Sequence, residues 1–315
     1  MMTMMNKNKK KHLIVLGTTG NMAFATANVL IGIKKHSPYL NADVVIYEQN
    51  VSENDKILLN SIMPCSFINY EFPVRQTERF DQDRLNRFTE LTFSRYECFR
   101  MLDEYKKIMW LDIDILIQGD ITPMFDYSDS TGISFVPEPY PVWSLFTQSV
   151  HGNYDWNKKF YNAGIFVIDD NLKDRDKLCD WCYKKTFEYA PFLHLPDQAI
   201  LNIMFQEFEI EIEPMARKYN CYPTDKSAKE AVLLHSYSSE KFWNFWDFKE
   251  WNQNYKKWLK MGGSAYTGKK ANFISREVKK IFPHAPDIIR KPRAFALYIV
   301  EEYKRIQNSK KQIKG

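Results

Sequence analysis

Glycine is scarce in this chain, with 11 glycines among 315 residues. So few glycines argue against a fold dominated by glycine-rich β-turns. No G-x-G-x-x-G pattern is present, which excludes the fingerprint of dinucleotide-binding proteins. Apolar residues make up 44% of the sequence and aromatic residues 15%, enough for one large domain or two closely joined ones with a real core.

Long apolar runs are also lacking. The longest N-terminal apolar strip, Leu13–Leu16, is too short for the core of a signal peptide. No run approaches the roughly 18 residues that a transmembrane helix needs. We therefore expect a protein that is soluble or peripheral to a membrane, located in the cytoplasm.

The five cysteines show no regular spacing that would indicate a disulfide framework. Cys179 and Cys182 have the C-x-x-C spacing of a zinc ligand pair, but no second pair lies nearby to complete a site. They also fall in a charged stretch, Leu172–Tyr189, whose pattern is helical. We expect ordinary reduced thiols and a reducing compartment.

Positive charge is concentrated at one end of the chain. From Lys269 onward there are 13 basic and four acidic residues, a net charge of +9, which leaves −4 for the rest of a chain whose total is +5. A nucleic-acid-binding protein usually carries its positive charge over the folded body, so no nucleic-acid partner is expected. The distribution indicates a basic appendage instead.

Short apolar runs alternate with helical patterns in the first half, which predicts a parallel sheet with crossover helices. Strands are predicted at His12–Gly17, Val44–Tyr47, Ser66–Tyr70, Lys107–Leu111, Gly132–Val136, Gly164–Ile168, Glu209–Ile212 and Ala231–His235. Helices are predicted at Met22–Ile33, from Ser52, at Leu85–Tyr105, at Lys173–Tyr189 and at Asp197–Phe205.

Two acids interrupt the most apolar of these segments, Trp110–Ile117 (WLDIDILI). A carboxylate near a core is costly unless it is paired, hydrogen-bonded or bound to a metal. Residues i and i+2 of a strand point to the same face, so Asp112 and Asp114 are expected to project together and to repel each other unless a cation lies between them. The sequence therefore predicts a divalent ion at the carboxyl end of this strand, where ligands gather in open α/β sheets.

Four blocks resemble the retaining family 8 glycosyltransferases, which have the Rossmann-like GT-A fold and include bacterial lipopolysaccharide glycosyltransferases. The resemblance covers roughly residues 12–245. The blocks occur in the family's order: Trp110–Ile121 (WLDIDILIQGDI), Phe160–Asp169 (FYNAGIFVID), Leu195–Asn202 (LPDQAILN) and Leu234–Trp243 (LHSYSSEKFW). It implies a mixed, mostly parallel sheet flanked by helices.

The resemblance also implies a metal and a nucleotide-sugar donor. In the family the two D-x-D aspartates and a later histidine bind the ion, and here those positions are Asp112, Asp114 and His235. A mixed carboxylate and imidazole set suits Mn²⁺ better than Mg²⁺. Lys241 matches the family lysine that contacts the diphosphate, whereas Ser238 stands where the family has a glycine.

Further residues match family contacts to the donor sugar. Asn162 and Gly164 match its sugar-binding block, and Arg95 matches an arginine that reaches the donor, although a surface charge on a helix is the alternative. Asp197 and Gln198 match the pair beside the anomeric carbon, and are predicted to be catalytic; a first-turn helix acid is the alternative for Asp197. Because an amide is a poor nucleophile, front-face attack is favoured over a covalent intermediate.

Nucleotide contacts are expected at the first strand-to-helix turn, in Gly17, Thr18, Thr19 and Asn21, and at Ile113 between the aspartates. Tyr47 is a candidate to stack on uracil or, alternatively, an aromatic at the edge of the core. The expected donor is a UDP-hexose, with galactose or glucose favoured. Acceptor contacts are expected in an aromatic segment: Pro139, Tyr140, Trp143, Tyr154 and Trp156 within Pro137–Trp156.

The predicted domains are a disordered leader at 1–11, a GT-A catalytic domain at 12–260 and a basic amphipathic tail at 261–315. In the tail, Phe295, Ile299 and Tyr303 recur at helical spacing among basic residues, a pattern suited to an anionic membrane surface. A helix packed on the core is the alternative.

Taken together, the chain is interpreted as a metal-dependent hexosyltransferase that acts on a glycan or glycolipid acceptor in polysaccharide biosynthesis. Two other classes fit part of the pattern. A phosphohydrolase of the haloacid dehalogenase type has a similar D-x-D block, but near its N-terminus. A non-catalytic sugar-binding protein would not need Asp112, Asp114, His235 and Lys241 together.

Overall fold

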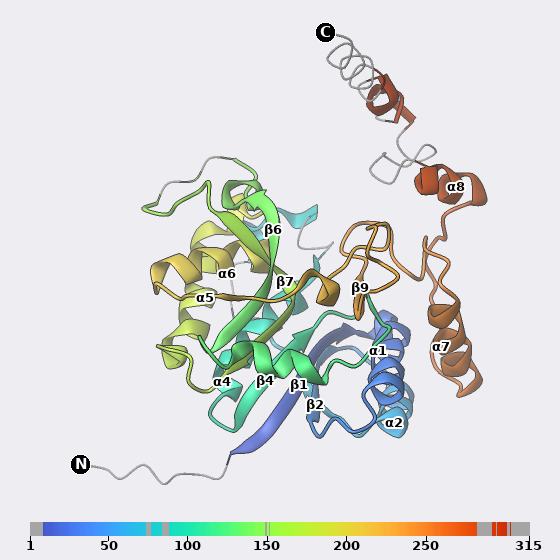
Figure 1. The fold of residues 1–315 in the computed structure, drawn as a ribbon, viewed down its shortest axis with the longest axis horizontal. Coiled ribbons are helices and arrows are strands. Elements are labelled where there is room, and N and C mark those ends of the chain that lie inside the picture. Colours follow the sequence, from blue (N-terminus) through green and yellow to red (C-terminus); the bar gives the residue numbers. More distant parts are fainter. Residues whose placement is uncertain are drawn as a thin grey trace.

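The computed structural model describes residues 9–73, 77–83, 88–148, 150, 152–281, 292–293, 295–300 and 303. Its centre is a seven-stranded sheet with the strand order β3-β2-β1-β4-β7-β6-β8 (Figure 1). The strands are β1 (Lys10–Thr19), β2 (Asp43–Gln49), β3 (Ser66–Asn69), β4 (Tyr105–Leu111), β6 (Ile133–Pro141), β7 (Lys159–Asp169) and β8 (Glu213–Pro214). Strands β1 to β4 are mutually parallel, whereas β7 is antiparallel to both β4 and β6.

A small second sheet pairs β5 (Ile115–Ile117) with β9 (Leu233–His235) in antiparallel fashion. Its register sets Ile115 opposite His235, so the chain segment that follows β4 meets the end of β9.

Helices cover both faces of the large sheet (Figure 1). One face carries α1 (Ala23–His36), α2 (Glu53–Ile62) and α7 (Lys249–Lys260); the other carries α4 (Glu97–Met101), α5 (Arg175–Tyr189) and α6 (Pro196–Glu207). Alternate residues of β1 enter two separate cores: Leu13 and Val15 pack beneath α4 to α6, and Ile14 and Leu16 pack beneath α1. This alternation explains why the middle of β1, Leu13–Leu16, is apolar without a break, because both faces of the strand are buried there.

The ends of several helices follow from local chemistry. The Ser52 hydroxyl caps α2 by accepting from the Asp55 backbone N–H at 3.1 Å. Pro196 begins α6, where its missing N–H costs nothing. Helix α1 is buried from Ala23 to Ile33 because it lies between the sheet and α7. The helix predicted from Ser52 and the one predicted at Met22–Ile33 are therefore confirmed.

Two predicted elements are wrong. The helix predicted at Leu85–Tyr105 is a 3₁₀ segment, Glu90–Tyr96, followed by the short α4; residues 84–87 lie outside the described residues. Helix α4 ends at Met101, and the last residue of the predicted helix, Tyr105, begins β4, where it pairs with Lys10 of β1. The leader predicted to be disordered through Lys11 thus enters the sheet at Lys10, and residues 1–8 lie outside the described residues.

The strand predicted at Glu209–Ile212 is also absent, because the chain there closes helix α6 with a turn. The Ile210 N–H bonds to the Phe205 carbonyl at 2.8 Å, and Glu209 adopts a φ of +49°. The strand β8 begins only at Glu213, and the proline at its second position limits it to two residues.

The remaining expectations concern the thiols, the membrane and the tail. All five cysteines are free, as predicted. Among the described residues no helix has the length and apolar character to span a bilayer. Helix α8 (Phe273–Ile281) lies outside the layered body in Figure 1, and much of the predicted tail beyond it is outside the described residues.

Candidate active site

Two adjoining hollows lie at the carboxyl ends of β1 and β4. One has a volume of about 360 Å³ and extends toward β6 and α6; the other, about 410 Å³, extends toward the β1–α1 turn. The residues that line both are Phe88, Thr92, Arg95, Asp112, Asp114 and Lys241. The D-x-D segment therefore forms the border between two binding spaces.

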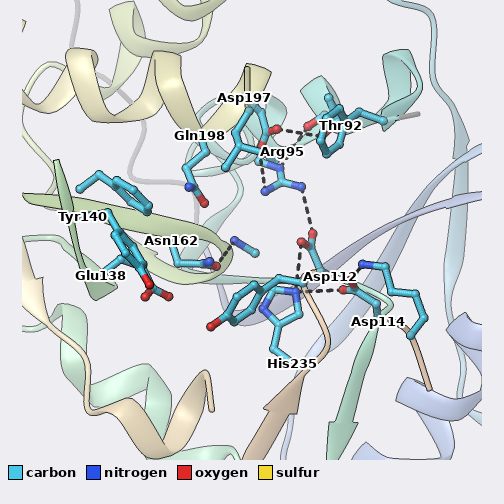
Figure 2. Close-up of a pocket in the computed structure, with 16 residues that line it drawn as sticks. Thr92, Arg95, Asp112, Asp114, Glu138, Tyr140, Asn162, Asp197, Gln198 and His235 are labelled. Carbon is cyan, nitrogen blue, oxygen red and sulfur yellow. Dashed lines mark hydrogen bonds and ion pairs between the residues drawn. The ribbon is translucent and has the colours of Figure 1, made fainter. Parts of the chain in front are cut away.

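Three predicted ligands converge at this border, as Figure 2 shows. The His235 Nε2 atom lies 2.9 Å from Asp114 Oδ1 and 3.7 Å from Asp112 Oδ2. One ligand atom from each of the three side chains lies within 4.8 Å of the others. This convergence is what a single bound cation requires.

The strand itself does not produce this convergence, which corrects the prediction. β4 ends at Leu111, and Asp112 to Asp114 form the loop between β4 and β5. The Asp112 N–H bonds to the Gly164 carbonyl at 2.8 Å, and the Asp114 carbonyl accepts from the Ser236 N–H at 2.9 Å. The pairing of β5 with β9 therefore brings Asp114 to His235, in place of the two-residue period of a strand.

The chemistry of His235 fits a metal. Its Nδ1 lies 2.7 Å from Asn220 Oδ1, and because an amide oxygen only accepts, Nδ1 carries the hydrogen. In the neutral ring Nε2 then presents a lone pair; this atom is buried and has no hydrogen-bond partner among the described residues. A lone pair facing a carboxylate oxygen at 2.9 Å is repulsive without a cation between them.

Each aspartate turns one oxygen toward His235 and the other toward a cationic side chain. Asp112 Oδ1 accepts from Arg95 Nη2 and from Trp110 Nε1, both at 2.9 Å. Asp114 Oδ2 pairs with Lys241 Nζ, which also donates to the Ser236 carbonyl at 2.8 Å. The inward oxygens, Asp112 Oδ2 and Asp114 Oδ1, are the ones available to an ion.

The two carboxylates differ in acidity. Burial raises the pKa of Asp112, against the pull of the Arg95 charge. Burial acts the same way on Asp114, but the neighbouring Lys241 ammonium holds its pKa well below the usual range. Asp114 is thus the more strongly stabilised anion of the pair.

Gly164 makes room for the cluster. A Cβ atom on this residue would lie 2.3 Å from His235 Cε1 and 2.7 Å from Asp112 Oδ2. Real Cβ atoms do not approach so closely, so any other residue would push the imidazole and the carboxylate apart. The glycine predicted from the sugar-binding block therefore has a steric role at the cluster.

Arg95 links the aspartates to helix α6, so it is not a surface charge. Its side chain is 6% exposed, and its Nη1 contacts Asp197 Oδ2 at 2.7 Å and the Ala163 carbonyl at 2.6 Å. Asp197 Oδ1 accepts from the Thr92 hydroxyl at 2.9 Å. Both oxygens of Asp197 are therefore occupied in holding Arg95 and Thr92.

Two amide side chains, Asn162 and Gln198, line the first hollow. Gln198 Oε1 accepts from the Ala163 N–H, and Asn162 Oδ1 accepts from the Gly164 N–H, both at 2.9 Å. Because the backbone fixes the two oxygens, the two NH₂ groups remain to donate into the hollow that both residues line (Figure 2).

The predicted nucleotide contacts separate into two groups. Five of them line the second hollow: Gly17, Thr18, Thr19, Asn21 and Ile113. Tyr47 and Ser238 line neither hollow. Tyr47 is buried in the core with its ring edge-on to Tyr70, and the Ser238 hydroxyl bonds to Tyr222 and Glu240.

Of the aromatic residues predicted to contact an acceptor, only Tyr140 lines the first hollow. Trp143 is 57% exposed, while Trp156 packs edge-on against Phe146 and Tyr154.

Three residues of the site were not predicted from the sequence: Glu138, Tyr237 and Asn220. Glu138 lines the first hollow, is 5% exposed, and accepts from Arg217 Nη1 at 2.8 Å; burial raises its pKa, and Arg217 opposes that rise. Tyr237 packs edge-on against His235. Glu138 lies within β6 after its buried residues Ile133–Val136, much as Asp112 follows the buried end of β4, and this is a signal that could have found it. Asn220 gave no such signal.

Comparison with known proteins identifies the family. The family model described as "Glycosyl transferase family 8" matches residues 13–247. The chain belongs to glycosyltransferase family 8. That assignment removes the support for a haloacid dehalogenase-type phosphohydrolase. It also agrees with the four ordered sequence blocks.

Individual relatives are distant. A "Probable galacturonosyltransferase 7" of Arabidopsis thaliana is 22% identical over 222 residues, which is 65% of this chain but 32% of the plant protein. The chain therefore spans about a third of the length of that relative.

Solved structures share the GT-A fold of the family. The galactosyltransferase LgtC, crystallised with donor and acceptor sugar analogues, gives a TM-score of 0.60 at 16% identity and covers 79% of this chain and 99% of its own. The glycosyltransferase GlyE of Streptococcus pneumoniae TIGR4 gives 0.52 at 16% identity, covering 80% and 64%. These likenesses establish the mixed, mostly parallel fold predicted from the sequence.

Proposed function

We propose that this family 8 glycosyltransferase is a metal-dependent, retaining hexosyltransferase that uses a UDP-sugar. The observation that carries the proposal is the convergence of Asp112, Asp114 and His235 at the border of two hollows. One hollow would hold the nucleotide and the other the sugar with its acceptor. A non-catalytic sugar-binding protein has no need for a cation site between two such spaces.

Asp112, Asp114 and His235 would hold the ion. An ion held at this place would supply positive charge to offset the charge of the diphosphate leaving group. The donor set of two carboxylates and one imidazole favours Mn²⁺ over Mg²⁺. The buried, unpartnered Nε2 of His235 supports this assignment.

Lys241 and the β1–α1 turn would bind the nucleotide. Lys241 lines both hollows and already faces Asp114, so its ammonium group is placed to contact a diphosphate held at the same border. Thr18, Thr19 and Asn21 line the second hollow, where the uridine would lie.

The sugar would occupy the first hollow beneath Asn162 and Gln198. Their NH₂ groups would donate to sugar hydroxyls, and galactose or glucose is the proposed hexose. The fold shared with a galactosyltransferase supports that choice.

Retention of configuration would proceed by front-face attack. Gln198 is the residue proposed nearest the anomeric centre; its amide oxygen is occupied by the Ala163 N–H and is a poor nucleophile. Asp197 is occupied by Arg95 and Thr92 and would position Arg95 instead of attacking the sugar.

The acceptor would be a glycan or glycolipid used in polysaccharide biosynthesis. Tyr140 offers an aromatic face, 59% exposed, at the rim of the first hollow. Glu138, on the same wall, would accept a hydrogen bond from an acceptor hydroxyl. We place the enzyme in the cytoplasm, held at an anionic membrane surface by its basic tail.

A thermal-shift screen tests this proposal. UDP-galactose and UDP-glucose are each added with Mn²⁺, with Mg²⁺ or with EDTA. We expect stabilisation by UDP-sugars only when a divalent ion is present, because a ligand stabilises the folded state in proportion to its binding. Asp114→Asn should abolish the metal-dependent part. A screen in which no nucleotide shifts the melting temperature in the presence of metal contradicts the proposal.

A further inference from the structure

We infer that the segment after α7, Gly262–Ala271, positions Lys241 for the diphosphate; this inference rests on the proposed function. We call this segment the strap. It follows α7, contacts α2 and α1, and ends beside the turn that carries Lys241. It belongs to the segment 261–315 that was predicted to be a basic tail.

The strap is fixed to the body at its beginning. Gly262 has a φ of +91°, which lets the chain reverse after α7. The Ser264 N–H and hydroxyl then bond to the two oxygens of Asp55, at 3.0 and 2.5 Å. Asp55 is 1% exposed, so the strap satisfies a buried carboxylate on α2.

The middle of the strap packs on aromatic residues. The Tyr266 N–H donates to the Tyr255 hydroxyl at 2.9 Å. The Tyr266 ring lies edge-on to Phe24 with centroids 5.5 Å apart, and Phe24 lies edge-on to Trp243 at 5.6 Å. Trp243 lines the second hollow, so this chain of rings runs from the strap to the proposed nucleotide site.

The end of the strap contacts the Lys241 turn directly. The Ala271 N–H bonds to the Asn244 carbonyl at 2.6 Å, and Ala271 is 6% exposed. The Asn244 side chain accepts from the Lys241 N–H at 2.8 Å and donates to the Ser239 carbonyl at 3.3 Å. Asn244 thus joins the strap to the backbone of Lys241.

These contacts have a functional consequence because Lys241 is a long, flexible side chain. Its ammonium reaches the border of the two hollows only if the turn at its base is held in place. The strap supplies that hold by tying the turn to α7 and to two helices distant in sequence, α1 and α2. Loosening the strap should weaken contacts made by Lys241 and leave contacts with the nucleoside unchanged.

The test compares two probes, UDP and uridine, in the presence of Mn²⁺ and with the full-length chain. The strap variant carries Tyr255→Phe and Ser264→Ala, which remove two strap contacts with little change of shape. We expect its UDP affinity, measured by calorimetry, to fall about three- to tenfold, the effect of a few lost hydrogen bonds. Uridine, which has no phosphate, should bind as it does to the wild type.

Asn244→Ala provides a second, independent variant and should give the same selective loss of UDP affinity. Thr267→Ala, at an exposed strap residue, is the matched control and should change neither affinity. In a Lys241→Ala background the strap substitutions should weaken UDP binding no further.

An equal loss for UDP and uridine would mean that the strap only supports the fold, and would overturn the inference. Unchanged UDP affinity in both the strap variant and Asn244→Ala, or a loss that adds to that of Lys241→Ala, would overturn it as well. If Lys241→Ala alone binds UDP normally, the proposed diphosphate contact itself is wrong, and the inference falls with it.

Discussion

At the residue scale, the orientation of the His235 ring depends on one amide. Asn220 accepts from Nδ1 at 2.7 Å and so directs the lone pair of Nε2 toward both aspartates. Partners of this kind fix the tautomer of a ligating histidine and raise its basicity. Asn220 lies just before the bridge that joins Cys221 to Leu234, and this pairing holds it beside β9.

Asn220→Ala should lower Mn²⁺ affinity by about 10- to 100-fold, the usual effect of losing such a partner. Isothermal titration of the metal into the nucleotide-free protein measures it. Asn220→Asp keeps an acceptor for Nδ1 and should retain most of the affinity. Wild-type affinity in Asn220→Ala would show that the ring needs no such support.

Gly164→Ala should also disrupt the metal site, for a steric reason. The added methyl group would lie 2.3 Å from His235 Cε1, so the imidazole must move away from the aspartates. We expect at least a tenfold loss of Mn²⁺ affinity in the same titration. Gly119→Ala is the matched control, because a Cβ there meets Val232 at an ordinary 3.5 Å. Equal metal binding by both variants would contradict the steric argument.

At the scale of elements, α1 and α7 are joined by a charged contact as well as by packing. The Glu250 carboxylate on α7 pairs with Lys35 Nζ at 2.6 Å and with His36 Nε2 at 2.7 Å on α1. Burial alone would raise the pKa of Glu250, but the hydrogen bonds to Lys35 and His36 hold it below 4.5. Because the folded state favours the ionised form, this contact stabilises the fold above about pH 4.5, and the contribution is lost as the pH falls through the lowered pKa.

Glu250→Gln should therefore destabilise the protein at pH 7, by about 0.5 kcal/mol for a contact that is partly exposed. The difference from the wild type should shrink as the pH falls below about 4.5. Urea unfolding at several pH values measures it. Glu53→Gln, at a carboxylate that is 83% exposed, serves as the control and should have little effect. A difference that stays constant down to pH 3 would contradict the assignment.

At the scale of the whole molecule, the apolar and basic residues of the tail contrast with the acidic body. The described tail residues include large apolar side chains that solvent reaches: Ile274 at 58%, Leu297 at 65%, Val300 at 50% and Tyr303 at 63%. Exposed apolar side chains beside many lysines and arginines support the proposed contact with an anionic bilayer surface. There the apolar side chains would leave water and the basic side chains would meet anionic lipid headgroups.

Leu297→Glu combined with Val300→Glu should weaken co-sedimentation with anionic vesicles at least several-fold, because both exposed apolar side chains become charged. Metal-dependent stabilisation by a UDP-sugar should stay at the wild-type level, since these residues line neither hollow. Neutral vesicles provide the baseline. Undiminished binding of the variant to anionic vesicles would rule out this surface as the membrane contact.

Much of this molecule follows from local sequence. The unbroken apolar runs of β1 and β4 predict buried parallel strands, because a strand covered on both faces needs no polar side. The acids at 112 and 114, placed after such a run, predict a cation site for the same energetic reason: buried carboxylates need a partner. The four ordered blocks predicted the family.

Tertiary structure decided the rest. Asp112 and Asp114 meet His235 through the pairing of β5 with β9 and not through the period of a strand, and that pairing joins residues more than 100 positions apart. The helix predicted before β4 ends at Met101, and its last predicted residue, Tyr105, pairs with Lys10 in the sheet instead. Asn220 and the strap carry no local pattern of their own. Their roles arise only from which side chains the fold brings within hydrogen-bonding distance, and a single stretch of sequence does not encode such distances.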